Sequence, residues 1–335
     1  MLVRQRGSGT YVRKVAATTP EAAEAWERAG RPDAAAFFAA ARSAGRLGSP
    51  RGRQRLHVSL WSDWLIPSPT QQARMAGMLE RVSARGHLMS AHAIVDAPDQ
   101  PPPPEILRQR IAESASDGAI VVLRWAARFL AAAPASLPVV FCGTIENALY
   151  QPSLSIGREG VLSSAVRILA QQGFRRIAVM TVASAGLEFQ AELLRRTYDA
   201  AMEAHGLAYR AFDLLPVGEV ARINRRFAPG PDRPDAVFVA DDSLLTPLHA
   251  ILTAHGIRPG RDMGIIVVSN RKISPLPSRE WSRLEYDQEA IGRMAVDMLL
   301  ESMEAPRGSP RNLCVLPTWI AGTTHLKNGG ASSKT

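Results

Sequence analysis

The fold is decided by residues 234–270, PDAVFVADDSLLTPLHAILTAHGIRPGRDMGIIVVSN. Residues 236–240 form a short apolar run rich in strand-forming residues, and residues 263–268 form a second one. The segment between them has leucine and isoleucine at helical spacing, which predicts an amphipathic helix that ends at Gly256. The stretch therefore predicts one strand–helix–strand unit of an open parallel sheet.

Polar side chains stop both strands of this unit. Asp241 and Asp242 follow the first strand, and Ser269 and Asn270 close the second. In open parallel sheets, ligands bind at the carboxyl ends of the strands. The unit therefore predicts an α/β domain with a small-molecule cleft.

Strand-like and helix-like segments alternate along the rest of the chain, which predicts parallel sheets with helices on both faces. At 335 residues the chain exceeds the usual size of one domain, and a polar connection at 143–156 interrupts the alternation, so we expect two lobes. The further strands are expected at 56–61, 87–95, 118–123, 138–141, 175–181, 208–214 and 313–316, and the further helices at 71–85, 105–113, 159–172, 189–205, 217–227 and 288–303.

The composition is that of a soluble globular protein, with 46% hydrophobic and 21% charged residues. No apolar run reaches the roughly 18–20 residues that span a bilayer, and the N-terminus lacks the apolar core of a secretory signal. Cys142 and Cys314 lie in apolar, strand-like runs, which favours buried reduced thiols over a disulfide. We therefore expect a cytoplasmic protein with no membrane partner.

The net charge of +9 is concentrated at the N-terminal end of the chain. Residues 1–55 hold eleven basic side chains against four acidic ones, whereas the remaining 280 residues hold 29 basic and 27 acidic ones. Such a segment is typical of a surface that faces nucleic acid. The alternative is a solvated leader that is rich in arginine.

The body of the chain resembles the effector domain of the lactose-repressor (LacI) family, which is related to periplasmic sugar-binding proteins. The resemblance rests on the order and spacing of GVLSSAVRILAQQGFRRIAVM (160–180), YDAAMEAHGL (198–207), PDAVFVADD (234–242), LEYDQEAIGRMAVDMLLESME (284–304) and LPTWIAGTTH (316–325).

This resemblance implies a two-lobed periplasmic-binding-protein-like fold over residues 55–326, in which each lobe is a parallel sheet flanked by helices. The chain would cross between the lobes three times. It also implies a homodimer that binds a small effector. The first lobe would hold residues 55–152 and 284–306, and the second residues 153–280 and 310–326.

The first twelve residues, with LVRQRGSGTYV, resemble the closing strand of the wing in GntR-type winged-helix DNA-binding domains. There, glycines form the tight β-turn, and arginines contact the phosphate backbone of an operator. The helix–turn–helix that reads bases would precede this remnant and is expected to be missing from the chain. A linker with one helix is expected at 13–54 and a disordered tail at 327–335. The residues that the resemblance assigns to DNA are Arg4, Arg6, Gly7, Ser8, Gly9 and Thr10.

The LacI-type resemblance also implies an effector pocket at the strand ends, where carboxylates and amides bind hydroxyl groups and aromatic rings stack on a sugar. Alternatives remain for two pairs: the two aspartates fit a helix cap, and the tryptophans fit core or lobe-interface packing. The candidates are Asp63, Trp64, Arg124, Trp125, Asp241, Asp242, Ser269, Asn270 and Arg271.

The chain departs from the family pattern at three places in this pocket. Gly157-Arg158 stands where the family has Asp-Asn, and Ser269-Asn270 stands where it has an aspartate. The arginine that the family has just before the 198–207 match would fall near Leu194, and Arg195 and Arg196 are close to that position but out of register. These changes favour an anionic or modified ligand, or none, over a plain hexose.

No catalytic, cofactor or metal motif is present. The seven histidines show no metal-ligand spacing with cysteine or acidic residues, and nucleotide-binding glycine loops and a nucleophile elbow are absent. We therefore expect no enzyme and no cofactor. The two resemblances together imply a transcriptional repressor that is controlled by an effector. The alternatives are a solute-binding protein of a transport system and a truncated regulator that dimerises without binding DNA.

Overall fold

The computed structural model divides into two compact units, each made of non-contiguous stretches. The first unit contains Met1–Ser155 and Glu289–Cys314, and the second contains Ile156–Gln288 and Val315–Thr335, so the chain crosses between them three times. The structure describes residues 55–63, 68–94, 102–123, 126–143, 151–182, 188–215, 220–276, 278, 280–304 and 311–327, and the backbone of 2–5 and 9–12. The predicted linker at 13–54 and residues 328–335 of the predicted tail lie outside the described residues.

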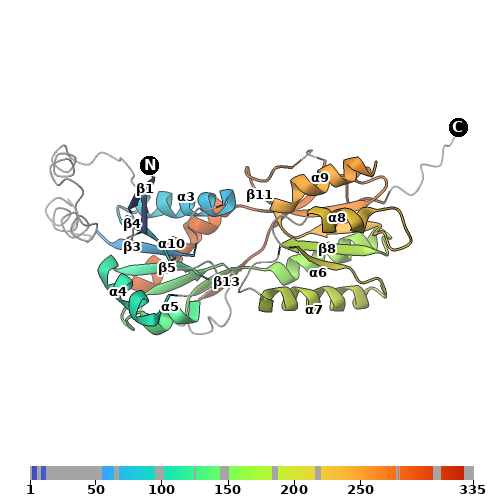
Figure 1. The fold of residues 1–335 in the computed structure, drawn as a ribbon. Helices are drawn as coiled ribbons and strands as arrows, with labels where there is room; N and C mark the ends of the chain where they lie inside the picture. Colours follow the sequence, from blue (N-terminus) through green and yellow to red (C-terminus); the bar gives the residue numbers. More distant parts are fainter. Residues whose placement is uncertain are drawn as a thin grey trace. The chain divides into compact units, whose positions relative to one another are not determined.

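The first unit is built on an eight-stranded sheet with the order β1-β2-β4-β3-β5-β6-β7-β13. The five neighbouring strands β4, β3, β5, β6 and β7 pair in parallel. Helices α4 and α5 cover one face of this sheet and α3 and α10 the other (Figure 1). The strands are β1 (Leu2–Gln5), β2 (Gly9–Val12), β3 (His57–Ser62), β4 (Leu88–Ala93), β5 (Gly118–Val122), β6 (Val139–Cys142), β7 (Ser153–Ile156) and β13 (Asn312–Val315), and the helices are α3 (Pro69–Ala84), α4 (Pro104–Ser114), α5 (Ala126–Ala132) and α10 (Gln288–Glu304).

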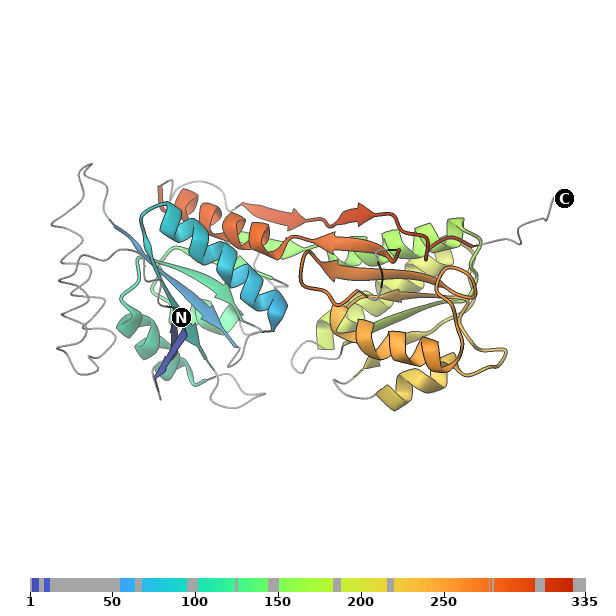
Figure 2. The same ribbon diagram turned by 90° about the horizontal axis from the view of Figure 1, so that it is seen from above.

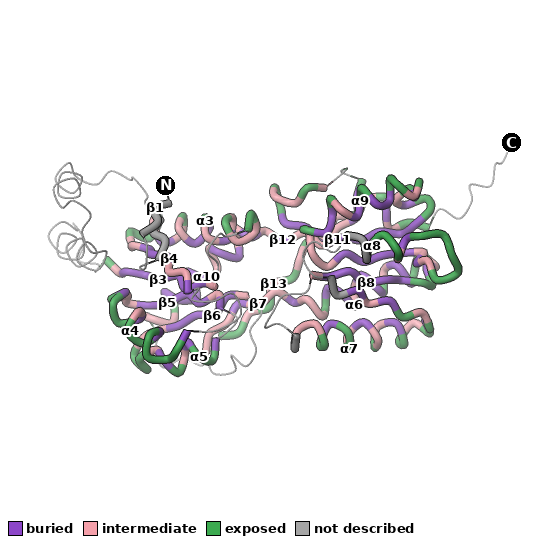
Figure 3. Tube along the Cα trace, in the orientation of Figure 1, coloured by how far each residue is buried: buried purple, intermediate pink, exposed green. Residues whose placement is uncertain are grey.

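The core of the first unit follows from the two-residue repeat of its central strands. Trp61, Ala119 and Val121 point to the face under α4 and α5, where they pack with the fully buried Phe129. Figure 3 shows the same division along the described part of the trace, with buried segments in the strands and exposed positions on the outer helix faces.

Helices α3 and α10 lie side by side in both ribbon views (Figures 1 and 2) and cross at two glycines. A Cβ atom on Gly77 would stand 2.0 Å from the backbone oxygen of Glu289. Likewise, a Cβ atom on Gly292 would stand 2.0 Å from the backbone oxygen of Arg74. The two backbones therefore approach more closely than any other residue type would permit.

Strands β1 and β2 pair antiparallel, with Leu2 opposite Val12. Strand β2 also extends the first sheet by pairing antiparallel with β4, with Thr10 opposite Ala91. Pairing along the sheet edge was not predicted, because the edge of β4 is not visible in the sequence. Residues 6–8 lie outside the described residues.

The second unit is built on a six-stranded sheet with the order β14-β12-β11-β10-β8-β9. All neighbours pair in parallel except β12 and β14, which are antiparallel. The strands are β8 (Ile177–Val182), β9 (Phe212–Leu215), β10 (Ala236–Val239), β11 (Gly264–Asn270), β12 (Ser282–Tyr286) and β14 (Thr318–Ile320), and the helices are α6 (Arg158–Gln171), α7 (Glu188–Ala204), α8 (Val220–Phe227), the 3-10 turn η1 (Asp242–Leu244) and α9 (Leu245–Ala254).

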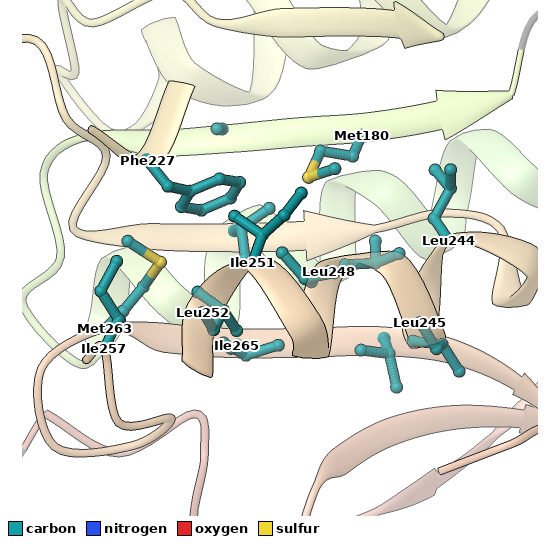
Figure 4. Close-up of a cluster of buried hydrophobic side chains, with 14 of the residues drawn as sticks. Met180, Phe227, Leu244, Leu245, Leu248, Ile251, Leu252, Ile257, Met263 and Ile265 are labelled. Atoms are coloured by element: carbon teal, nitrogen blue, oxygen red, sulfur yellow. The ribbon is translucent and has the colours of Figure 1, made fainter. Parts of the chain in front are cut away.

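The leucine and isoleucine stripe predicted between residues 243 and 255 forms the core of the second unit (Figure 4). Leu248 and Ile251 of α9 lie against Phe227 of α8 and Met180 of β8, and all four are buried. Burying a side chain of this size contributes about 1.5–3 kcal/mol each. The predicted strand–helix–strand stretch is therefore the centre of this unit.

The two sheets confirm the predicted fold class, a two-lobed α/β architecture with a parallel-dominated sheet in each lobe. Four described elements were not predicted: α5, β7, β12 and β14. They are three to seven residues long, which is too short for a clear hydrophobic period.

Candidate functional site

The carboxyl ends of β10 and β11 lie next to each other in the second unit. The two strands are parallel, with Ala236 opposite Gly264 and Val239 opposite Val267. Asp241 and Asp242 follow β10, and Asn270 ends β11, so the register brings their side chains to one edge of the sheet. We call the set Asp242, Asn270, Ser274 and Gln288 the amide relay, because hydrogen bonds connect its members.

Asp241 acts as a helix cap. Its Oδ1 accepts hydrogen bonds from the backbone N–H of Ser243, at 3.0 Å, and from the Ser243 hydroxyl. These bonds satisfy the first donor of η1, as the capping alternative predicted. The neighbouring aspartate has a different role.

Asp242 is the acceptor at the start of the amide relay. Its Oδ2 accepts a hydrogen bond from Asn270 Nδ2 at 2.7 Å and another from the Ser274 hydroxyl at 2.7 Å. The backbone N–H of Asn270 in turn donates to Ser274 Oγ at 2.6 Å. Residues 270–274 therefore form a turn whose hydroxyl group is held against the carboxylate.

Gln288 completes the relay from the first position of α10. Its Nε2 donates to Asn270 Oδ1 at 2.6 Å, and the residue is 3% exposed. Beside it, Arg271 Nη1 lies 3.3 Å from Asp287 Oδ2 in an exposed ion pair. Asn270 thus uses both ends of its amide inside the second unit.

Ser269 points into the core instead of toward this edge. Its side chain is fully buried on the same face of β11 as Ile265 and Val267. Its hydroxyl has no hydrogen-bond partner among the described residues, and an unsatisfied buried group of this kind costs about 1–3 kcal/mol. Because of this orientation, Ser269 does not share the exposed edge with Asp242.

At the corresponding edge of the first unit, one predicted effector residue is described. Asp63 follows β3 and is partly exposed, whereas Trp64, Arg124 and Trp125 lie outside the described residues. Of the residues assigned to DNA, Arg6, Gly7 and Ser8 also lie outside them, and for Arg4, Gly9 and Thr10 the backbone alone is described.

Arg74 is a buried cation that the sequence did not single out. It lies on α3, is 7% exposed, and its guanidinium stands near the position that a Cβ of Gly143 would occupy, at 3.8 Å. Burial raises the pKa of the Cys142 thiol, and the neighbouring Arg74 opposes that increase. The first unit therefore carries a positive charge just beyond the end of β6.

Three residues of these two edges were missed in the sequence: Ser274, Gln288 and Arg74. Ser274 and Gln288 reach Asp242 and Asn270 across 32 and 18 residues, which no local pattern reports. Arg74 occupies a position on the buried face of α3, where the helical period alone could have identified it.

Comparison with protein families identifies the fold. Residues 166–325 match the family model of the periplasmic binding protein-like domain. The chain has the periplasmic-binding-protein-like fold. No relative was found among the curated proteins.

Solved structures with this periplasmic-binding-protein-like fold include several transcriptional regulators. A LacI transcriptional regulator from a Rhodococcus species is 19% identical, covers 81% of this chain and 98% of its own, and has a TM-score of 0.63. The lac repressor dimer bound to operator and the anti-inducer ONPF is 16% identical, with coverages of 91% and 88% and a TM-score of 0.68. The regulator CelR in complex with cellobiose is 20% identical, with coverages of 88% and 92% and a TM-score of 0.63.

Two kinds of feature are absent from the described residues. No helix among them combines the length and apolar character that crossing a membrane requires. Within the same residues, no cluster of three or more histidine, cysteine, aspartate or glutamate side chains is placed to hold a metal ion.

Proposed function

We propose that this chain is the effector-binding part of a transcriptional repressor, and that its effector is a small polar molecule such as a sugar or a sugar derivative. The observation that supports this most directly is the cluster of Asp241, Asp242 and Asn270 at the carboxyl edge of the second sheet. Carboxylates at such an edge accept hydrogen bonds from hydroxyl or amino groups of a ligand. Two structural neighbours support the same class of function: one is a LacI transcriptional regulator, and the other is the regulator CelR in complex with cellobiose.

Within this proposal, Asp242 is the main effector contact of the second unit. Its Oδ2 accepts the two bonds of the relay, and its side chain is partly exposed. Asp63, Trp64, Arg124, Trp125 and Arg271 are proposed as further contacts. Asn270 is proposed to act on the ligand through Asp242, to which its Nδ2 donates a hydrogen bond.

The test is calorimetric titration of the purified chain with a panel of mono- and disaccharides, cellobiose, and sugar phosphates. Asp242→Ala should weaken binding of the active compound by at least about tenfold, because a buried or half-buried hydrogen bond to a charged group contributes about 1.5–3 kcal/mol. Asp262→Ala is the matched control, since this aspartate precedes β11 at the opposite end of the strand. An unchanged affinity in Asp242→Ala, or no heat with any compound, would contradict the proposal.

DNA recognition is proposed to belong to a GntR-type winged helix, of which residues 2–12 form the last part of the wing. This part of the proposal rests on LVRQRGSGTYV and on the basic segment 1–55. The regulator is further proposed to be a cytoplasmic homodimer, so that two DNA-binding heads match the two halves of a palindromic operator. Sedimentation equilibrium should give the mass of two chains, and a monomer at micromolar concentration would contradict the dimer.

A further inference from the structure

The amide relay ends where the chain leaves the second unit. Gln288 is the last residue of that unit before Glu289 begins the second stretch of the first unit. Three of the four relay residues, Asp242, Asn270 and Gln288, come from different elements: η1, β11 and α10. A side-chain connection therefore runs from the proposed effector edge to one of the three crossings of the chain.

The relay has one possible direction of hydrogen bonding. The carboxylate of Asp242 can only accept, so the Asn270 amide must present its Nδ2 to Asp242. Asn270 Oδ1 then faces Gln288, whose Nε2 is the donor. The charge of Asp242 thus sets the orientation of the Asn270 amide, and that orientation in turn provides the acceptor for Gln288.

On the far side of the crossing, α10 is fixed to α3 within the first unit. The reciprocal glycine contacts of Gly77 and Gly292 leave no space between the two backbones. Two ion pairs extend this contact: Arg293 to Glu80 at 3.0 Å and Asp297 to Arg81 at 2.7 Å. A displacement of the first turn of α10 is therefore transmitted to α3 as well.

We propose that Gln288 and Ser274 are positioning residues that couple Asp242 to the first turn of α10. Ser274 holds the Asp242 carboxylate, and Gln288 holds the start of the helix to the Asn270 amide. A ligand that draws Asp242 toward itself weakens the bond to Asn270 and loosens the start of α10. The ligand-linked step rests on the proposed function; the coupling itself does not, and it requires only that the two ends of the relay influence each other.

Hydrogen–deuterium exchange on the ligand-free chain tests the coupling. In Asp242→Ala, the amides of residues 290–292 in the first turn of α10 should exchange about tenfold faster, because the bonds that hold this turn are local and open below the global unfolding free energy. Asp241→Ala is the matched control: it removes the adjacent carboxylate, which caps Ser243 instead of joining the relay, and should leave residues 290–292 unchanged. The amides of β10 report global stability in both variants.

Gln288→Met tests the relay from its other end, since methionine keeps the unbranched shape but cannot donate a hydrogen bond. It should speed exchange at residues 290–292 to a similar extent, and the double variant with Asp242→Ala should add little more, because both changes break one chain of bonds. Additive effects, or equal acceleration in Asp241→Ala, would overturn the coupling. If no sugar binds in the titration but the exchange results are as expected, the proposed effector is wrong and the coupling is still supported.

Discussion

His92 is a buried residue whose titration should affect folding. Its imidazole stacks on Trp61 with ring centroids 4.4 Å apart, and Ser90 Oγ lies 2.8 Å from both His92 Nε2 and His57 Nε2. Burial lowers the pKa of His92 to about 3, and the neighbouring His57 contributes to that decrease. The first unit therefore folds around an uncharged His92 whose ring shares Ser90 with His57.

The pKa of His92 predicts a loss of stability in acid. Between its ordinary pKa of 6.5 and about 3, the unfolded chain binds a proton at this site that the folded chain does not. The free energy of unfolding should therefore fall as pH decreases below 6.5, by up to about 1.4 kcal/mol per pH unit from this residue. Urea unfolding of the wild type and of His92→Gln across pH 7.5 to 4.5 measures the difference, and an identical pH dependence in the two proteins would show that His92 is not its source.

Individual residues at the site were only partly predictable. The sequence placed Asp241 and Asp242 at a strand end, because the change from apolar run to carboxylates is local. It could not place Gln288 next to Asn270, since 18 residues and one strand separate them. It also could not show that Ser269 faces the core, because a shift of one position along β11 changes the face.

At the scale of elements, the crossing of α3 and α10 gives the most specific prediction. Gly77→Ala or Gly292→Ala should destabilise the first unit by about 1–3 kcal/mol or more. The added methyl group would clash with backbone atoms, which cannot move aside by a change of side-chain rotamer. Gly160→Ala in α6 is the control: nothing lies within 4 Å of the position that its added methyl group would take, and alanine favours a helix over glycine by about 1 kcal/mol. In thermal unfolding, the midpoint temperature of Gly160→Ala should be higher than that of the wild type, and the midpoints of Gly77→Ala and Gly292→Ala should be lower.

Long elements were predicted well, and the reason is visible in α3. Ser68 and Gln71 form a capping box, and Pro69 occupies the first turn, which are strong local signals for a helix start. The strands β12 and β14 carry no such signal. Their place in the sheet depends on antiparallel pairing between Arg283 and Ile320, which lie 37 positions apart in the chain.

At the scale of the whole molecule, each unit has its own core. The backbone amides of one unit should therefore lose their protection from hydrogen exchange independently of those of the other unit. Leu248→Ala in the second core should raise hydrogen exchange in β10 and β11 more than in β5, and Leu60→Ala in the first unit should do the reverse. Each substitution should cost about 2–5 kcal/mol, since both side chains are almost fully buried. Equal loss of protection across both sheets in either variant would indicate a single cooperative structure instead.

The predicted architecture of two parallel-dominated sheets followed from the alternation of strands and helices, which is a property of the whole chain. The sheet order did not follow from it, because β13 joins the first sheet from position 312. Such distant pairings depend on which strand edges remain open after the local units have formed.

The discontinuity of the first unit has a consequence during synthesis on the ribosome. Its β3 to β6 emerge early, but α10 and β13 are translated only after the entire second sheet up to β12 has been made. Until then, the side of α3 around Gly77 and Met78, which α10 covers in the folded unit, has no covering helix. A nascent chain would therefore expose this apolar surface of α3 for most of its elongation. Chaperones that recognise such surfaces could bind it throughout that period.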